Sequence, residues 1–150
     1  MQINTYPAIN VLYSTFKTSI LTIHDKIGTV ARDLYAEAAR QHLLVTGPVI
    51  WMYYGADGNP ETMFTLEIAL PVSGIAETSD RFLFKELPPF KCLFVTHPGA
   101  WSELKDVYAK MIDKIQHDGL VMNDVCREIY LNIDFSRDES NLTIVQIGLA

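Results

Sequence analysis

One acidic residue, Glu128, lies within a run of residues, Cys126–Asn132, that favours a β-strand. Because successive side chains of a strand point to opposite faces, Glu128 and Tyr130 share one face, and Ile129 and Leu131 share the other. An unpaired carboxylate on a dry face costs several kcal/mol unless its pKa rises or a cation neutralises it. We therefore interpret the face of Glu128 as a candidate binding site. The alternative is a glutamate that faces solvent on a two-sided sheet.

The elements around this strand follow the same order in both halves of the chain. In each half, a strand comes first, then a helix with one apolar face, and then two strands that form a hairpin. Thr22 and Asp25 have the spacing of a capping box at the start of the first helix, and Gly119 marks the end of the second. The predicted strands are 9–16, 49–54, 63–72, 90–96, 125–132 and 142–149, and the predicted helix faces carry Ile23, Ile27, Val30, Leu34 and Ala38 in the first half and Leu104, Val107, Tyr108, Met111, Ile112 and Ile115 in the second.

This order predicts an α+β fold made of two duplicated β-α-β-β units in a single domain over residues 1–150. We place the first repeat at about residues 5–75 and the second at about residues 88–150. Two helices with one apolar face each can cover only one face of an antiparallel sheet. We therefore expect both helices on one face and a ligand cleft on the other, between the two repeats.

Strand parity collects the side chains that we expect in this cleft. The apolar positions of strands 63–72 and 142–149 are expected to face the helices, which directs Glu67 and Gln146 to the opposite face. Trp101, at the start of the second helix, either forms a wall of the cleft or packs that helix against the sheet. Aromatic rings attract a positive charge and a carboxylate neutralises it, so this composition is typical of a pocket for an amphipathic organic cation. The expected lining comprises Glu128, Tyr130, Glu67, Trp51, Tyr53, Trp101 and Gln146.

Composition limits the classes of partner. The chain has a net charge of −6 and lacks the clustered lysines and arginines that bind nucleic acid or anionic membranes. No segment has the roughly 18 unbroken apolar residues that span a bilayer, and the N-terminus has no signal-peptide pattern. Cys92 and Cys126 lie in apolar runs. We expect a cytoplasmic protein with reduced cysteines that binds neither nucleic acid directly nor membranes, and exposed strand edges leave a homodimer open.

Several short segments, in the duplicated order of elements, resemble the GyrI-like small-molecule-binding domain. This domain is also the effector-binding domain of multidrug-responsive transcription activators of the AraC and MerR types. The resemblance covers about residues 5–149 and rests on the order and spacing of the segments rather than on any one of them. The segments are Thr65–Val72, His97–Gly99 leading into Trp101, Arg127–Leu131 and Leu142–Ile147.

The resemblance implies a cleft between the repeats in which the glutamate at the position of Glu128 contacts cationic aromatic ligands. An acid that matches Glu67 recurs in the first repeat of the family. The implied role is that of a sensor or a sequestering protein. In the activators the domain is fused to a DNA-binding module, whereas here the first predicted strand begins at Ile9 and leaves too short a segment for a helix-turn-helix. We therefore do not expect direct promoter binding.

Two other functions stay open. Some GyrI-like proteins are reported to open strained or electrophilic molecules, and in such a hydrolase Glu128 would be the general base and Tyr130 or Tyr53 an electrophilic donor. A weaker alternative is inhibition of a topoisomerase, for which the charge of −6 is modest and dispersed.

We expect no metal and no cofactor. No histidine in a helical segment has a carboxylate or a second histidine at i+4 to complete a metal site, and no glycine-rich loop is suited to phosphate. We interpret His97 as a turn histidine and Cys126 as a packed thiol.

Overall fold

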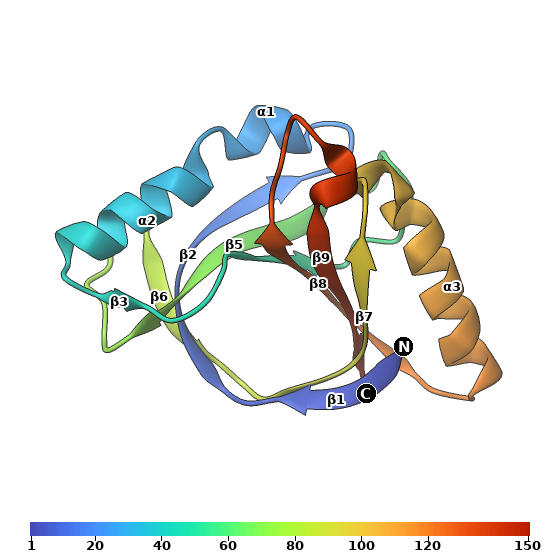
Figure 1. Ribbon diagram of the computed structural model, residues 1–150. Coiled ribbons are helices and arrows are strands. Elements are labelled where there is room, and N and C mark those ends of the chain that lie inside the picture. The colour runs from blue at the N-terminus through green and yellow to red at the C-terminus, as the bar shows by residue number, and fades with distance from the viewer.

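The computed structural model describes residues 1–150 and has an α+β fold built on one strongly curled antiparallel sheet (Figure 1). The strand order is β1-β7-β9-β8-β4-β5-β2-β6, and β3 pairs with β5 off this path. None of the helices is long and apolar enough to cross a membrane. The strands are β1 (Gln2–Tyr6), β2 (Ile9–Thr18), β3 (Leu44–Val45), β4 (Ile50–Tyr54), β5 (Phe64–Ser73), β6 (Leu83–Leu87), β7 (Phe90–Pro98), β8 (Met122–Asn132) and β9 (Leu142–Leu149), and the helices are α1 (Ile23–Ile27), α2 (Val30–Arg40) and α3 (Leu104–His117), with short 3₁₀ segments η1 (Trp101–Glu103) and η2 (Asp138–Ser140).

The duplicated order of elements is confirmed. The first unit runs β2, α1 with α2, β4 and β5, and the second runs β7, α3, β8 and β9. The two units meet where β4 pairs with β8, with Trp51 opposite Glu128. The sequence analysis did not predict β1 and β6, which cross between the units: β1 pairs with β7 of the second unit, and β6 pairs with β2 of the first.

These two additional strands explain the curl of the sheet. β1 continues into β2, and β6 continues into β7, in each case through a short bend that contains proline. The two bent strands pair on both sides of the bends, Tyr6 with Phe90 and Ile9 with Leu87. The two ends of the sheet are therefore tied together, which gives the sheet an outer face and an inner face (Figure 1).

The helices pack on the outer face, over its two ends. α2 buries Leu34 against β2 and β5, whereas α3 buries Met111 and Ile115 against the second unit. The two helices therefore belong to two separate hydrophobic cores, and the central strands β4 and β8 lie between them (Figure 1). The predicted apolar face of the second helix is confirmed, because all six of its residues belong to this second core.

Part of the inner face packs against itself. Because the sheet curls, apolar side chains from β2, β4, β5 and β6 meet inside it and form a third core. Its buried members are Val11, Ile50, Met52, Ala69 and Leu87.

The first helix differs from its prediction. A break at Gly28, where the backbone φ is +49°, divides the expected single helix into α1 and α2. Thr22 does not cap α1 through its side chain, because its hydroxyl lies in the preceding turn and accepts the backbone N–H of Ser19 at 3.2 Å. In contrast, Gly119 ends α3 as predicted: its φ is +67°, and the next N–H donates to the carbonyl of Ile115 at 2.9 Å.

Candidate functional site

Glu128 is the centre of a buried polar cluster on the outer face, where the two units meet. Its carboxylate accepts three tyrosine hydroxyls: Tyr108 donates to Oε1 at 2.8 Å, Tyr53 donates to Oε2 at 3.2 Å, and Tyr130 also donates to Oε2. Tyr53 comes from β4, Tyr130 from β8 and Tyr108 from α3. We call these four residues the tyrosine–carboxylate cluster. It joins the central strands to the helix of the second unit.

The electrostatics of the cluster are those of an acid without a counter-ion. Glu128 is only 7% exposed, and no lysine, arginine or histidine nitrogen lies within 4.0 Å of its oxygens. Burial raises the pKa of Glu128, while the hydroxyls of Tyr130, Tyr108 and Tyr53 oppose this increase by stabilising the charge. A carboxylate offers about four acceptor sites. The three tyrosine hydroxyls occupy three of them.

Aromatic rings adjoin this acid, because Trp51 lies opposite Glu128 in the β4–β8 pair and Tyr130 donates to its carboxylate. The rings of Trp51 and Tyr130 meet edge to face at 5.5 Å between centroids, and Trp101 meets Tyr130 in the same way at 5.8 Å. Phe135, in the β8–β9 connection, lies 5.7 Å from Trp101. We call Trp51, Trp101, Tyr130 and Phe135 the aromatic wall. The first three are partly exposed, so the wall presents ring surface to solvent with a negative charge behind it.

The structure divides the predicted site residues between the two faces of the sheet. It brings Glu128, Tyr130, Trp51, Tyr53 and Trp101 together on the outer face. This is the face that carries the helices, whereas the sequence analysis placed these residues on the opposite face. The reason is that α2 and α3 cover only the ends of the outer face, and the central strands keep polar and aromatic side chains between them. Trp101 both contributes to the wall and packs against the core of the second unit.

The other two predicted residues, Glu67 and Gln146, lie on the inner face. Glu67 is 8% exposed and accepts a hydrogen bond from the ammonium group of Lys85 at 2.6 Å. Gln146 lies on β9 opposite Arg127 of β8. Their expected contact with a ligand shared with Glu128 is therefore incorrect, because the sheet itself separates them from that carboxylate.

Sequence reasoning missed Tyr108 as a member of the site. Its position on the apolar face of α3 was predicted, and a core position concealed its polar role. A buried tyrosine hydroxyl nearly always has a hydrogen-bond partner, and this requirement was the signal that could have linked Tyr108 to the unpaired acid. Burial, followed by the charge of Glu128, holds the pKa of Tyr108 well above its usual value, so its hydroxyl remains a donor.

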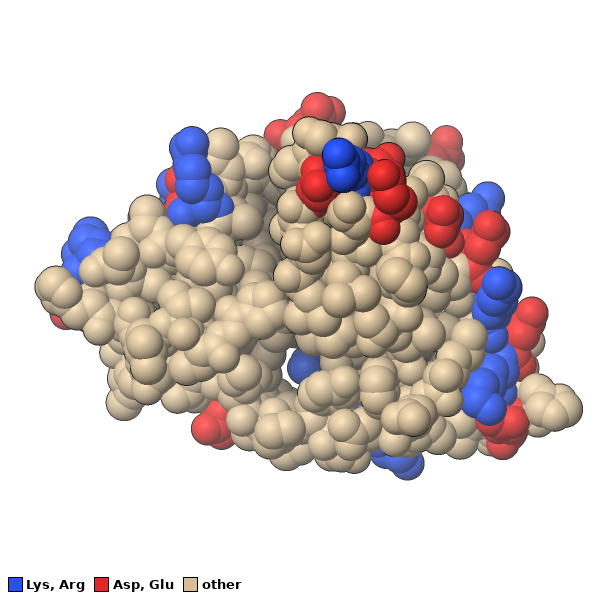
Figure 2. Space-filling model, viewed as in Figure 1, with Lys and Arg blue, Asp and Glu red and all other residues tan.

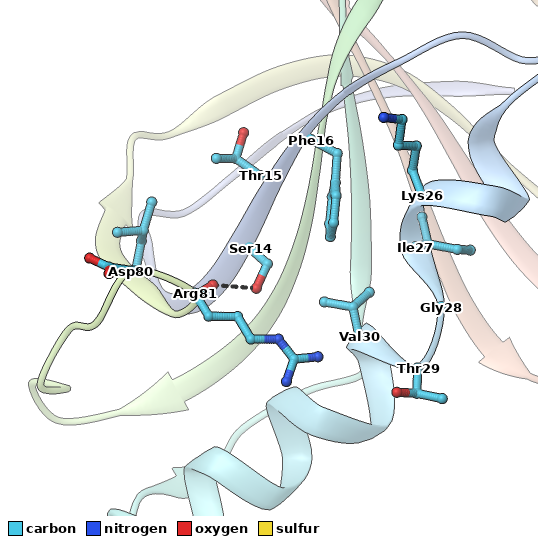
Figure 3. Close-up of a pocket in the computed structure, with 11 residues that line it drawn as sticks. Ser14, Thr15, Phe16, Lys26, Ile27, Gly28, Thr29, Val30, Asp80 and Arg81 are labelled. Atoms are coloured by element: carbon cyan, nitrogen blue, oxygen red, sulfur yellow. Dashed lines mark hydrogen bonds between the residues drawn. The ribbon is translucent and has the colours of Figure 1, made fainter.

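Glu128 lines neither of the two main cavities of the molecule. The larger, about 550 Å³, lies where the turn between α1 and α2 faces β2 (Figure 3). Arg81 borders it, but that guanidinium is already paired with Asp33, and Ser14 donates its hydroxyl to the Arg81 carbonyl at 2.7 Å. Lys26 and Asp80 also line this cavity, and neither forms an ion pair within 4.0 Å. The smaller cavity, about 230 Å³, lies on the inner face.

The remaining candidate groups have local roles. The ring Nε2 of His97 lies 3.2 Å from the carbonyl oxygen of Ala100 and 3.3 Å from Oε2 of Glu103, in agreement with a turn histidine. Burial raises the pKa of the Cys126 thiol to about 11, so the group is protonated at neutral pH and packs as a thiol. No group of three or more His, Cys, Asp or Glu side chains has the geometry to hold a metal ion.

Comparison with known proteins places the chain in a family. The sequence model described as the GyrI-like small molecule binding domain matches residues 1–149, so the chain belongs to the GyrI-like family. A comparison with curated protein sequences gives no match.

Solved structures share the fold at low sequence identity. The C-terminal domain of EcmrR superposes with a TM-score of 0.82 and 15% identity over 99% of this chain and 96% of that domain. The chain spans only 56% of the EcmrR chain seen in an EcmrR–DNA complex. A hydrolase encoded by lin2189 from Listeria innocua gives a TM-score of 0.73 at 15% identity, over 99% of this chain and 91% of that one. SAV2435, solved bound to tetraphenylphosphonium, gives a TM-score of 0.63 at 13% identity, over 99% of this chain and 93% of that one.

Proposed function

We propose that the chain binds an amphipathic, aromatic organic cation at the tyrosine–carboxylate cluster and acts as a sensor or a sequestering protein. The observation that carries the proposal is Glu128, a buried carboxylate with three hydroxyl donors and no cationic partner in the protein. Membership of a small-molecule-binding family supports the proposal. So does the likeness to SAV2435, whose structure contains a lipophilic aromatic cation.

The chemistry of the cluster fits such a ligand better than a neutral one. Burial of an uncompensated charge is costly, and a ligand cation would remove that cost at Glu128. The faces of Trp51, Trp101 and Tyr130 attract a cation through their negative π surface, and their apolar area accepts the rings of the ligand. Because Glu128 is only 7% exposed, a ligand reaches the carboxylate only when the surrounding side chains move.

The two tryptophans make this proposal directly testable. The chain has only two, and both lie in the aromatic wall. Titration with tetraphenylphosphonium is therefore expected to change the intrinsic tryptophan fluorescence in a saturable way. Trp51→Phe and Trp101→Phe should each remove part of this signal. A wild-type protein whose fluorescence and titration heats do not respond to the cation would refute the proposed site.

A second function, hydrolysis of an electrophilic small molecule, is supported by one feature of the same cluster. Burial raises the pKa of Glu128 towards the range of a general base, and Tyr53, Tyr108 and Tyr130 supply hydroxyls that could polarise a substrate. The likeness to the Listeria innocua hydrolase is consistent with this function. However, the three hydroxyls also stabilise the carboxylate and weaken it as a base. We therefore place binding before catalysis.

A further inference from the structure

The inner face carries a buried charge of the opposite sign, the guanidinium of Arg127. Arg127 is only 6% exposed, and no carboxylate oxygen lies within 4.0 Å of its nitrogens. Its Nε has no hydrogen-bond partner, and its closest described interaction is with the ring of Phe90, 3.7 Å from the centroid. Such a cation–π contact offsets only part of the cost of desolvating a guanidinium.

The nearest acid on this face does not serve as the partner. Glu67 is engaged by Lys85 at 2.6 Å. Strand register places Met52 of β4 between them, because Met52 pairs with Glu67 on one side and with Arg127 on the other. Two strand spacings separate the acid from the arginine, about 10 Å. Arg127 is therefore an unpaired cation inside the protein.

A second unpaired polar group faces the same place. Gln146 lies directly opposite Arg127 in the β8–β9 pair and is 1% exposed. Both its amide nitrogen and its amide oxygen are buried without a hydrogen-bond partner. Each unsatisfied buried group costs on the order of 1–3 kcal/mol. Only a group from outside the protein chain, a water molecule or a ligand, can satisfy these atoms.

Arg127 and Gln146 line the cavity of about 230 Å³ inside the curled sheet. Figure 2 shows a narrow opening into the molecule at the centre of the view, with basic atoms visible inside it. The rest of the lining is mainly apolar, formed by three prolines, three isoleucines, a glycine and a tyrosine. These residues are Pro7, Pro48, Pro71, Ile9, Ile50, Ile129, Gly47 and Tyr6.

We propose that this inner cavity is a second binding site, for a small organic carboxylate with a compact apolar body. The guanidinium of Arg127 presents a planar fork of N–H donors that matches a carboxylate, and the amide N–H of Gln146 can donate to the same group. The prolines and isoleucines accept the apolar body. The volume lies below the roughly 300–1,000 Å³ of pockets for drug-sized ligands, so the ligand is small. An inorganic phosphate has the charge but would leave the apolar lining without a partner.

Calorimetric titration of the full chain with benzoate and with hexanoate tests this assignment, with neutral benzamide and inorganic phosphate as comparison ligands. Arg127→Met removes the charge at similar volume, and Gln146→Leu removes the amide at similar shape. Each variant is expected to weaken carboxylate binding, Arg127→Met by about 10- to 150-fold. One control should bind benzoate as the wild type does: Arg137→Met, which changes an exposed arginine.

The outcomes separate this proposal from the outer site. Benzoate binding that is lost in Arg127→Met while tetraphenylphosphonium binding persists supports two independent sites. If Arg127→Met does not fold, Gln146→Leu decides: weaker benzoate binding supports the site, and unchanged binding overturns it. The proposal is also overturned if neither carboxylate gives saturable heat, if benzamide binds as tightly as benzoate, or if phosphate alone binds.

Discussion

Glu128→Gln is the substitution that tests the outer site most directly. Glutamine keeps the shape of the side chain but removes its charge, and it turns one acceptor oxygen of the cluster into an N–H donor. The hydroxyls of Tyr53, Tyr108 and Tyr130 can rotate to adapt, so the fold should persist. A hydrogen bond to a charged group contributes about 1.5–3 kcal/mol. The dissociation constant for tetraphenylphosphonium is therefore expected to increase about 10- to 150-fold.

The chain supplies a matched control in Glu67, a second buried carboxylate. Glu67 lies on the inner face and is hydrogen-bonded to Lys85 at 2.6 Å, so Glu67→Gln should leave cation binding unchanged.

Calorimetry should compare the cation with triphenylphosphine oxide, a neutral aromatic of similar size. Glu128→Gln should hardly change the affinity for this neutral ligand. The effect on the cation should persist in high salt, because a buried charge pair is screened less than an exposed one. Equal losses of affinity for the cation and the neutral ligand would refute an electrostatic role for Glu128. An equal loss in Glu67→Gln would refute the separation of the two faces.

Four further predictions follow from the same contacts. Tyr108→Phe removes one donor to Glu128 and should further raise the pKa of that carboxyl, so the pH at which cation binding falls to half, measured by fluorescence titration, should increase. The pKa of Glu128 is raised above 4.5 in the folded state. Between pH 4.5 and the folded-state pKa, the native protein therefore binds more protons than the unfolded chain. In this window the stability of the native protein decreases as pH increases. Glu128→Gln should remove this decrease, so in denaturant unfolding it should gain stability over the wild type at neutral pH but not below pH 4.5. Ile115→Ala should cost about 2–5 kcal/mol of unfolding free energy. Lys110→Ala, at an exposed position of α3, should cost at most about 0.5 kcal/mol. Equal costs would mean that the buried face of α3 is misassigned. Mass spectrometry after incubation with strained-ring electrophiles should show unchanged compound, and a product formed by the wild type but not by Glu128→Ala would favour hydrolysis.

Periodicity in the sequence was sufficient for the local elements. The helical spacing around Met111 and Ile115 predicted α3 and its buried face, since each of these side chains is at most 1% exposed. Alternation along β8 correctly separated Glu128 and Tyr130 from Ile129. Both patterns depend only on neighbours within a few residues, and a sequence contains that information directly.

The curl of the sheet could not be predicted in the same way. It depends on β1 and β6. β1 pairs with β7 of the second unit, whereas β6 lies between the predicted repeats and pairs with β2 of the first. Both strands are short and carry weak periodicity. The sequence analysis assumed that one face of the sheet must be covered by helices and the other open. Curling provides another arrangement, in which the inner face buries itself around Met52 and Ala69. Parity was therefore correct within each strand, but the sequence analysis placed Glu67 and Glu128 on one face, whereas they lie on opposite faces of the sheet.

Adjacent residues of β8 show what this difference means for ligand choice. Arg127 and Glu128 would be expected to neutralise each other if they shared an environment, but consecutive positions of a strand point to opposite faces. The sheet sends the acid to the outer cluster and the base to the inner cavity, where neither has a partner of opposite charge. The two proposed sites therefore call for ligands of opposite sign, a cation outside and a carboxylate inside.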